Sequence, residues 1–333
     1  MRREGELRRH SWLPAPLRGA SRESGGNHAP SSNARGGCGV ALLACLSACG
    51  GTDPNPLSKK DTAPDKKTEH TSGKDLGLAT HKDFDRTRFD RPTEIDNEWF
   101  PLKPGTQFVY EGSVSDDGRR IPHRVVFTVT DLTKVINGVR TVVLWDRDFT
   151  DGELVEEELA CHAQDNDGNV WNMGEYPEEY EEGRFAGAPD VWITGSGDAR
   201  AGVLMRTEPR EETPGYWQGL ALSIEFADRA KVLETGQKTC VPVDCYDDVL
   251  VIQEWDPTEP GAFQHKYYAS GVGNVRVGWG GPNEDERETL ALSEVRQLDP
   301  AALEDVRQEA LRLEERAYRI SKRVYGGTPP LQR

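Results

Sequence analysis

Short runs of β-branched and aromatic residues, separated by turn-forming pairs, constrain this 333-residue chain more than any other feature. Asn137-Gly138 stands between two of these runs, and Asn-Gly in that position is a strong signal for a β-hairpin. The runs lie at residues 106–112, 124–130, 139–145, 247–255, 265–269, 272–277 and 289–295. Their close spacing predicts antiparallel connections, and because helices do not alternate with them, the pattern excludes a doubly wound nucleotide-binding sheet.

The end of the chain predicts a helix over residues 299–326. Asp299 is a suitable N-cap, Pro300 suits the first helical position, and Gly326-Gly327 ends the pattern. Apolar residues recur at spacings of three and four: Leu303, Val306, Ala310, Leu313, Ala317, Ile320 and Val324. This stripe could form a coiled coil, but its two alanines favour close packing on a sheet. We therefore expect a mainly β fold, an antiparallel curved sheet or open barrel with the C-terminal helix packed on it, which resembles lipoprotein-carrier architecture.

The N-terminal region predicts export from the cytoplasm. A short apolar run at residues 40–48 follows Arg35 and ends in small residues before Cys49, as in a secretory signal. The tail L-S-A-C at residues 46–49 resembles the lipobox of bacterial lipoproteins, which implies removal of residues 1–48 and lipidation of Cys49. In the alternative interpretation, residues 37–50 form a buried helix or strand. The same resemblance places the protein in the cell envelope, and Gly50 after the cysteine favours the outer membrane of a two-membrane host.

Composition separates a tether from a domain. Residues 49–93 follow the signal and begin with a stretch almost free of apolar side chains, which predicts a disordered tether. We expect the β-rich domain to span residues 94–298. The chain carries a net charge of −16, and removal of the basic signal region would leave −20. Such a charge argues against a nucleic-acid partner, so the expected membrane contact is the lipid anchor.

Three cysteines lie in the predicted domain. An exported domain should oxidise its thiols, so Cys240 and Cys245 could close a small loop, or Cys161 could pair with either of them. Zinc binding by these three cysteines together with His162 is an alternative, because the ligand types fit.

The loop at residues 165–169 is a candidate cation site. Asp165, Asp167 and Asn169 offer side-chain oxygens at alternate positions, as calcium loops do. Its spacing departs from the EF-hand pattern, however, so a polar hairpin turn with Gly168 is the competing interpretation. Apart from this possible calcium ion, the sequence predicts no cofactor.

Several segments together resemble a family of uncharacterised exported bacterial proteins and lipoproteins. They read A-Q-D-N-D-G-N-V-W-N-M-G-E at residues 163–175 and K-Y-Y-A-S-G-V-G-N-V at residues 266–275. The family pattern is A-Q-D-x-x-G-N-V-W-Y-x-G-E, followed later by K-Y-Y-A-P-G-V-G, so Asn172 and Ser270 depart from it. The resemblance covers about residues 96–296 and implies export without implying a reaction.

No catalytic motif stands out in the sequence. G-x-S-x-G and H-E-x-x-H are both missing, and the acidic run at residues 178–182 is expected to be a solvated loop. Most tryptophans are expected in the core, although exposed ones beside acids could bind a glycan. The leading hypothesis is a non-enzymatic binding or interaction module whose partner is an envelope protein, a glycan or a small apolar ligand. Two alternatives are a carrier of an apolar ligand within the curved sheet and a hydrolase with a carboxylate pair.

Overall fold

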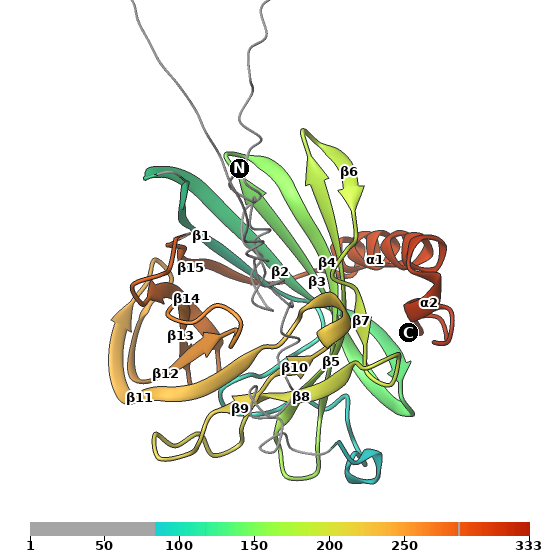
Figure 1. Ribbon diagram of the computed structural model, residues 1–333, viewed down its shortest axis with the longest axis horizontal. Coiled ribbons are helices and arrows are strands. Elements are labelled where there is room, and N and C mark those ends of the chain that lie inside the picture. The colour runs from blue at the N-terminus through green and yellow to red at the C-terminus, as the bar shows by residue number, and fades with distance from the viewer. Residues whose placement is uncertain (1–83, 117, 286) are drawn as a thin grey trace, which may run out of the picture. The chain divides into compact units, whose positions relative to one another are not determined.

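The computed structural model describes residues 84–116, 118–285 and 287–333, so Cys49 and the predicted signal lie outside the described residues. Within that part the chain forms one 15-stranded sheet, two α-helices and two short 3-10 helices, Arg86–Arg88 and Leu222–Ile224 (Figure 1). The strands of the first half are β1 (Thr106–Asp116), β2 (Arg119–Ile136), β3 (Val139–Thr150), β4 (Glu153–Gln164), β5 (Val170–Glu181), β6 (Arg184–Gly187), β7 (Trp192–Ile193) and β8 (Arg200–Met205). Those of the second half are β9 (Tyr216–Trp217), β10 (Gly219–Leu220), β11 (Arg229–Cys240), β12 (Cys245–Trp255), β13 (Phe263–Ala269), β14 (Gly273–Gly280) and β15 (Thr289–Gln297).

The sheet is antiparallel, and its hairpins confirm the turn chemistry of the sequence. Asn137 and Gly138 have φ angles of 48° and 83°, which lets Ile136 and Val139 pair directly across the β2–β3 hairpin. Asp151 and Gly152 form the next turn in the same way, with φ angles of 52° and 84°. Each of the seven predicted runs overlaps a strand, so the predicted mainly β, antiparallel fold with a C-terminal helix is confirmed.

The sheet is nearly closed into a barrel by one short segment of chain. Its order runs β10-β8-β5-β4-β3-β2-β1-β15-β14-β13-β12-β11-β9, and only Gln218 separates the two end strands, β9 and β10, in sequence. β9 pairs with β11 at one end of the order, whereas β10 pairs with β8 at the other (Figure 1). Residues 216–220 therefore join the two edges, and we call them the closing segment.

One expectation from the sequence, a solvated acidic loop, is wrong. The acidic run at residues 178–182, predicted to be a solvated loop, mostly belongs to β5, and the Glu178 side chain is fully buried. Arg316 of the C-terminal helix contacts both carboxylate oxygens of Glu178 at 2.9 Å through its Nε atom. The tyrosine hydroxyls of Tyr176 and Tyr180 donate to the same carboxylate. The acidic strand is therefore buried because a helix distant in sequence covers it.

Helix α1 (Pro300–Ile320) packs against β2 and β4 through the predicted stripe, whose members Val306, Ala310, Leu313 and Ala317 are buried. The Asp299 carboxylate accepts hydrogen bonds from the backbone N–H groups of Ala301 and Ala302, as expected of an N-cap. The helix ends at Ile320, before the predicted end, and a short α2 (Lys322–Tyr325) follows. The break at Ser321 allows Tyr325 to enter the core while Ile320 remains 43% exposed. Among the described residues, no helix is both long and apolar enough to cross a membrane.

Candidate functional site

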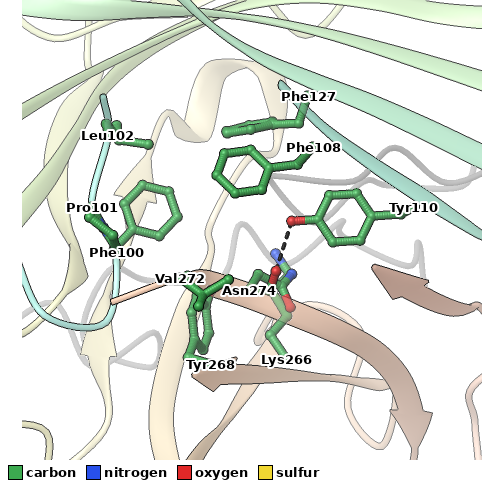
Figure 2. Close-up of a pocket in the computed structure, with 11 residues that line it drawn as sticks. Phe100, Pro101, Leu102, Phe108, Tyr110, Phe127, Lys266, Tyr268, Val272 and Asn274 are labelled. Atoms are coloured by element: carbon green, nitrogen blue, oxygen red, sulfur yellow. Dashed lines mark hydrogen bonds between the residues drawn. The ribbon is translucent and has the colours of Figure 1, made fainter. Parts of the chain in front are cut away.

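An aromatic pocket opens on the inner face of the curved sheet. The cavity itself has a volume of about 30 Å³ and merges with space that is open to solvent. Eleven residues line it: Phe100, Pro101, Leu102, Phe108, Tyr110, Phe127, Lys266, Tyr268, Val272, Gly273 and Asn274. Figure 2 shows the rings of Phe100, Phe108, Phe127 and Tyr268 around one space, with Lys266 below them. Apolar walls around one charged group are typical of the lining of small-molecule sites.

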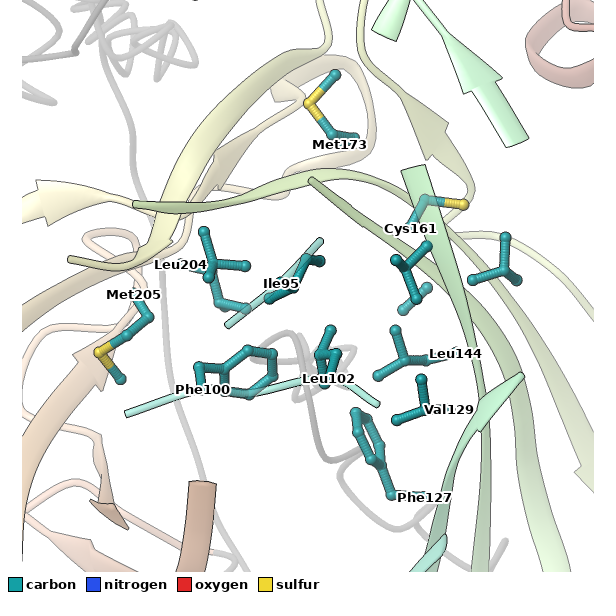
Figure 3. Close-up of a cluster of buried hydrophobic side chains, with 14 of the residues drawn as sticks. Ile95, Phe100, Leu102, Phe127, Val129, Leu144, Cys161, Met173, Leu204 and Met205 are labelled. Carbon is teal, nitrogen blue, oxygen red and sulfur yellow. The ribbon is translucent and has the colours of Figure 1, made fainter. Parts of the chain in front are cut away.

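Strand periodicity places these side chains together. Phe108 and Tyr110 lie two residues apart on β1 and therefore point to the same face, as Lys266 and Tyr268 do on β13. Phe108 pairs directly with Phe127 of β2, and their ring centroids are 6.2 Å apart. Phe100 comes from the segment before β1, and its ring lies 6.4 Å from that of Tyr268. The walls of the pocket are part of the main apolar core, because Phe100, Leu102 and Phe127 belong to the same hydrophobic cluster as Leu144 (Figure 3).

A buried ion pair forms the floor of the pocket. The Lys266 ammonium is fully buried and lies 2.5 Å from the Glu254 carboxylate of β12. The second Glu254 oxygen accepts a hydrogen bond at 2.9 Å from the amide of Gln218, in the closing segment. The Tyr110 hydroxyl donates to the backbone oxygen of Asn274 at 2.8 Å (Figure 2). Charged groups buried away from water need partners. Through Glu254, the Lys266 of the pocket is linked to Gln218 in the closing segment.

Further carboxylates lie beside that floor. Asp146 of β3 is 4% exposed and is the cross-strand partner of Phe127, a pocket residue. Burial raises its pKa well above the ordinary value, and the nearby Glu156 carboxylate adds to the rise. Glu175 of β5 is also buried, and its pKa is raised to about 7 mainly by burial. The inner face of β3, β4 and β5 is therefore an acidic wall.

A buried histidine lies on the same inner face. The two ring nitrogens of His123 contact different carboxylates, Nδ1 with Asp148 at 3.2 Å and Nε2 with Glu288 at 2.9 Å. Glu288 also accepts a hydrogen bond from the Gln264 amide at 2.6 Å. The charged residues of this face thus form linked networks.

The structure settles how the cysteines are used. Cys240 and Cys245 form a disulfide across the β11–β12 hairpin, while Cys161 is a free, buried thiol. Burial raises the Cys161 pKa to about 12, so this thiol is a poor nucleophile at neutral pH. Burial lowers the pKa of neighbouring His162 to about 3. The alternative zinc site is wrong, because two of its four ligands are bonded to each other.

The candidate calcium residues lie together in the turn between β4 and β5. Asp165 accepts hydrogen bonds from the backbone N–H groups of Asp167 and Asn169 and from the indole of Trp171. Asp167 pairs with Arg88 instead of turning toward Asp165. In the described part of the chain, His, Cys, Asp and Glu side chains form no group of three or more that could hold a metal ion. These contacts favour the polar turn, and calcium binding stays a prediction that equal melting temperatures in calcium and in chelator would contradict.

Four of the seven tryptophans among the described residues, Trp145, Trp171, Trp192 and Trp217, are buried in the core, whereas Trp279 is 39% exposed. Sequence reasoning did not identify the pocket, although Phe108 and Tyr110 fall in a predicted strand. One available signal was Lys266, a charged residue two positions from Tyr268 and therefore on the same face of a predicted strand.

Comparisons with known proteins add two distant structural likenesses. No protein-family model matches the chain, and no curated protein matches it. One similar structure is a crystal structure from Bacteroides fragilis described as a "putative exported protein with YmcC-like fold", with a TM-score of 0.33 and 14% identity. Another is a crystal structure from Parabacteroides distasonis described as a "putative lipoprotein", with a TM-score of 0.33 and 13% identity. Each alignment covers 60% of this chain and 99% of the other.

Proposed function

We propose that this protein is a lipid-anchored binding protein of the cell envelope that holds a small apolar or amphipathic ligand inside its curved sheet. The observation that carries the proposal is the aromatic pocket between β1, β2 and β13. Among the hypotheses from the sequence, a pocket of this kind favours the carrier. A completely filled interior would instead have favoured a module that binds partners through its surface.

The binding energy would come from apolar contact. Transfer of apolar surface from water contributes about 25 cal/mol for each Å² buried. Phe100, Phe108 and Phe127 present ring surface to the cavity, as do the partly polar Tyr110 and Tyr268. Their hydroxyl groups and the Lys266–Glu254 pair would orient the polar end of a ligand.

Binding can be tested by isothermal titration calorimetry with octanol. The protein is the full chain carrying Cys49→Ala, because acyl chains on Cys49 could themselves occupy the pocket. We expect saturable binding that Val272→Phe weakens by about tenfold or more, since the larger ring fills the cavity and a tenfold change corresponds to about 1.4 kcal/mol. Val243→Phe is the matched control, because Val243 is 40% exposed in the disulfide loop. Equal octanol affinities in the two variants, or no binding of octanol at all, would refute the pocket as the ligand-binding site.

The anchor is a separate part of the proposal, and the lipobox residues support it. The predicted tether of residues 49–93 would link the β-rich domain of residues 94–298 to the membrane, with the outer membrane favoured in a two-membrane host. Its last part packs on that domain, because Phe84 and Phe89 contact the ring of Trp171. We expect Cys49→Ala to move the protein from the membrane fraction to the soluble fraction, because at least two acyl chains give a stable anchor. Cell fractionation followed by immunoblotting measures this. A variant that stays in the membrane fraction would refute lipidation at Cys49 and leave the pocket hypothesis intact.

A further inference from the structure

Beside the pocket, acidic side chains outnumber basic ones. Lys266 is the one cationic side chain among the described lining residues, and Glu254 neutralises it at 2.5 Å. Next to this pair stands Asp146, which interacts electrostatically with both Lys266 and Glu156. Glu158 is the cross-strand partner of Asp146 and lies on the same face. The floor therefore has carboxylates in excess of ammonium groups.

Among the described residues, three buried polar atoms without hydrogen-bond partners belong to residues that interact with Lys266 or Glu254. In the described structure, the Oδ1 atom of Asp146 has no hydrogen-bond partner although the residue is 4% exposed. The hydroxyl of Tyr216, also 4% exposed and electrostatically coupled to Glu254, has none either. The same holds for the side-chain oxygen of Gln218. A buried polar atom without a partner is unfavourable, so a bound polar group that completes these contacts would be stabilised.

We propose that the pocket takes an amphipathic cation, a molecule with an apolar chain and an ammonium group, and that the ammonium group binds at Asp146. This proposal rests on the proposed function and names its ligand class. The apolar chain would lie among Phe100, Phe108 and Phe127, whose ring faces also attract cations. An anionic end group would instead meet Asp146, Glu156 and Glu158 with Lys266 already paired, so the acidic wall disfavours it.

Binding of a cation at Asp146 should release a proton. Asp146 interacts electrostatically with Glu156 of β4, Lys266 of β13, Tyr110 of β1 and its chain neighbour Arg147, and its cross-strand partner is Glu158. Burial and the Glu156 carboxylate raise the pKa of Asp146, which favours its protonated form over the carboxylate. An ammonium group favours the carboxylate form, and the proton leaves to solvent as the cation arrives. Affinity for a cation should therefore rise as pH increases.

The experiment compares octylamine, octanol and octanoate by calorimetry on the full chain carrying Cys49→Ala. We expect octylamine to bind about tenfold or more tightly than octanol, and octanoate more weakly than octanol. Titrations of octylamine in buffers with different ionisation enthalpies should show proton release, and its affinity should rise from mildly acidic to mildly alkaline pH. Octylamine remains protonated throughout, as a lysine side chain does.

Variants assign the effect to one residue. Asp146→Asn should abolish the preference for octylamine over octanol and the proton release, while octanol binding remains. Asp151→Asn is the matched control, since it removes the same charge at the exposed β3–β4 turn. If Asp146→Asn does not fold, the inference is tested by the protein that keeps Asp146. Octylamine binding must then release protons and strengthen as pH rises, or the inference is refuted. Octanol binding without preference for octylamine overturns this inference alone, whereas failure of all three probes overturns the proposed function as well.

Discussion

Glu175 shows how a residue in the most distinctive sequence motif acts in the structure. One carboxylate oxygen accepts a hydrogen bond from the Asn172 amide at 2.5 Å, and the other accepts from the Trp192 indole at 2.9 Å. In the same motif, Asp165 accepts from the Trp171 indole and the Asn169 amide. The polar residues of the A-Q-D-N-D-G-N-V-W-N-M-G-E segment therefore hold the β4–β5 hairpin and β7 together.

The raised pKa of Glu175 predicts a pH-dependent stability. Burial is the largest cause, the bonds from Asn172 and Trp192 oppose it, and Asp228 and Glu156 raise the pKa further to about 7 from an ordinary 4.5. The folded state thus holds the proton more tightly than the unfolded state does. It follows that Glu175 lowers the free energy of unfolding as pH rises from about 4.5 to about 7, with no further change above that range.

We expect Glu175→Gln to remove this loss of stability. Asn172 has a free side-chain oxygen among the described contacts and can rotate to accept from the new amide, so the substitution preserves both hydrogen bonds. Relative to the unsubstituted chain, the variant should gain roughly 3 kcal/mol between about pH 4 and about pH 8, at 1.36 kcal/mol per pKa unit. Urea unfolding across this pH range measures it. Glu181→Gln, at the exposed end of the same strand, should show no such trend.

At the scale of elements, a buried lysine fixes helix α1 and the chain end to the sheet. The Lys134 ammonium of β2 donates to the Glu314 carboxylate at 2.6 Å and to the backbone oxygen of Pro329 at 2.9 Å. It also lies 4.7 Å from the centre of the Tyr325 ring. Glu314 in turn accepts from the backbone N–H of Leu331. One cation therefore joins β2, α1 and the last residues of the chain.

We expect Lys134→Met to destabilise the protein by about 3 kcal/mol or more, because it leaves the buried Glu314 carboxylate without its cation. Denaturant unfolding gives the free energy, and hydrogen exchange should show that α1 loses protection before the sheet does. Lys322→Met removes an equal charge from an exposed position in α2 and should change stability by less than about 0.5 kcal/mol. Similar losses in both variants would mean that the helix is held by its apolar stripe alone.

At the scale of the whole molecule, a glycine allows the sheet to close. Gly202 of β8 lies against the closing segment so tightly that a Cβ atom there would be 2.3 Å from the carbonyl carbon of Gln218 and 2.4 Å from the oxygen of Trp217. Both are backbone atoms and cannot turn aside as a flexible side chain can. A glycine at this position is therefore a requirement of the closed sheet.

Gly202→Ala should consequently displace residues 216–220. We expect a loss of about 1–3 kcal/mol in the free energy of unfolding, the usual cost of overpacking, and faster hydrogen exchange in the closing segment. Gly187→Ala in β6 is the control, because the added Cβ would have its nearest neighbour at 3.9 Å. Unchanged exchange in Gly202→Ala would show that the edges can separate slightly without cost.

Local chemistry was enough to predict seven of the strands, the turn at Asn137-Gly138 and the C-terminal helix. Asn and Gly both tolerate left-handed backbone angles, which Asn137 and Gly138 adopt, and the stripe of α1 follows from helical periodicity. The burial of Glu178 was not predictable, because it depends on Arg316, 138 residues further along the chain. The Lys134–Glu314 pair spans 180 residues, and the Lys266–Glu254 pair gains its surroundings from β1, β2 and the closing segment. Only the closed sheet brings such groups together. Once they are buried, their charges interact much more strongly than the same charges would in water, because the protein interior has a lower dielectric constant.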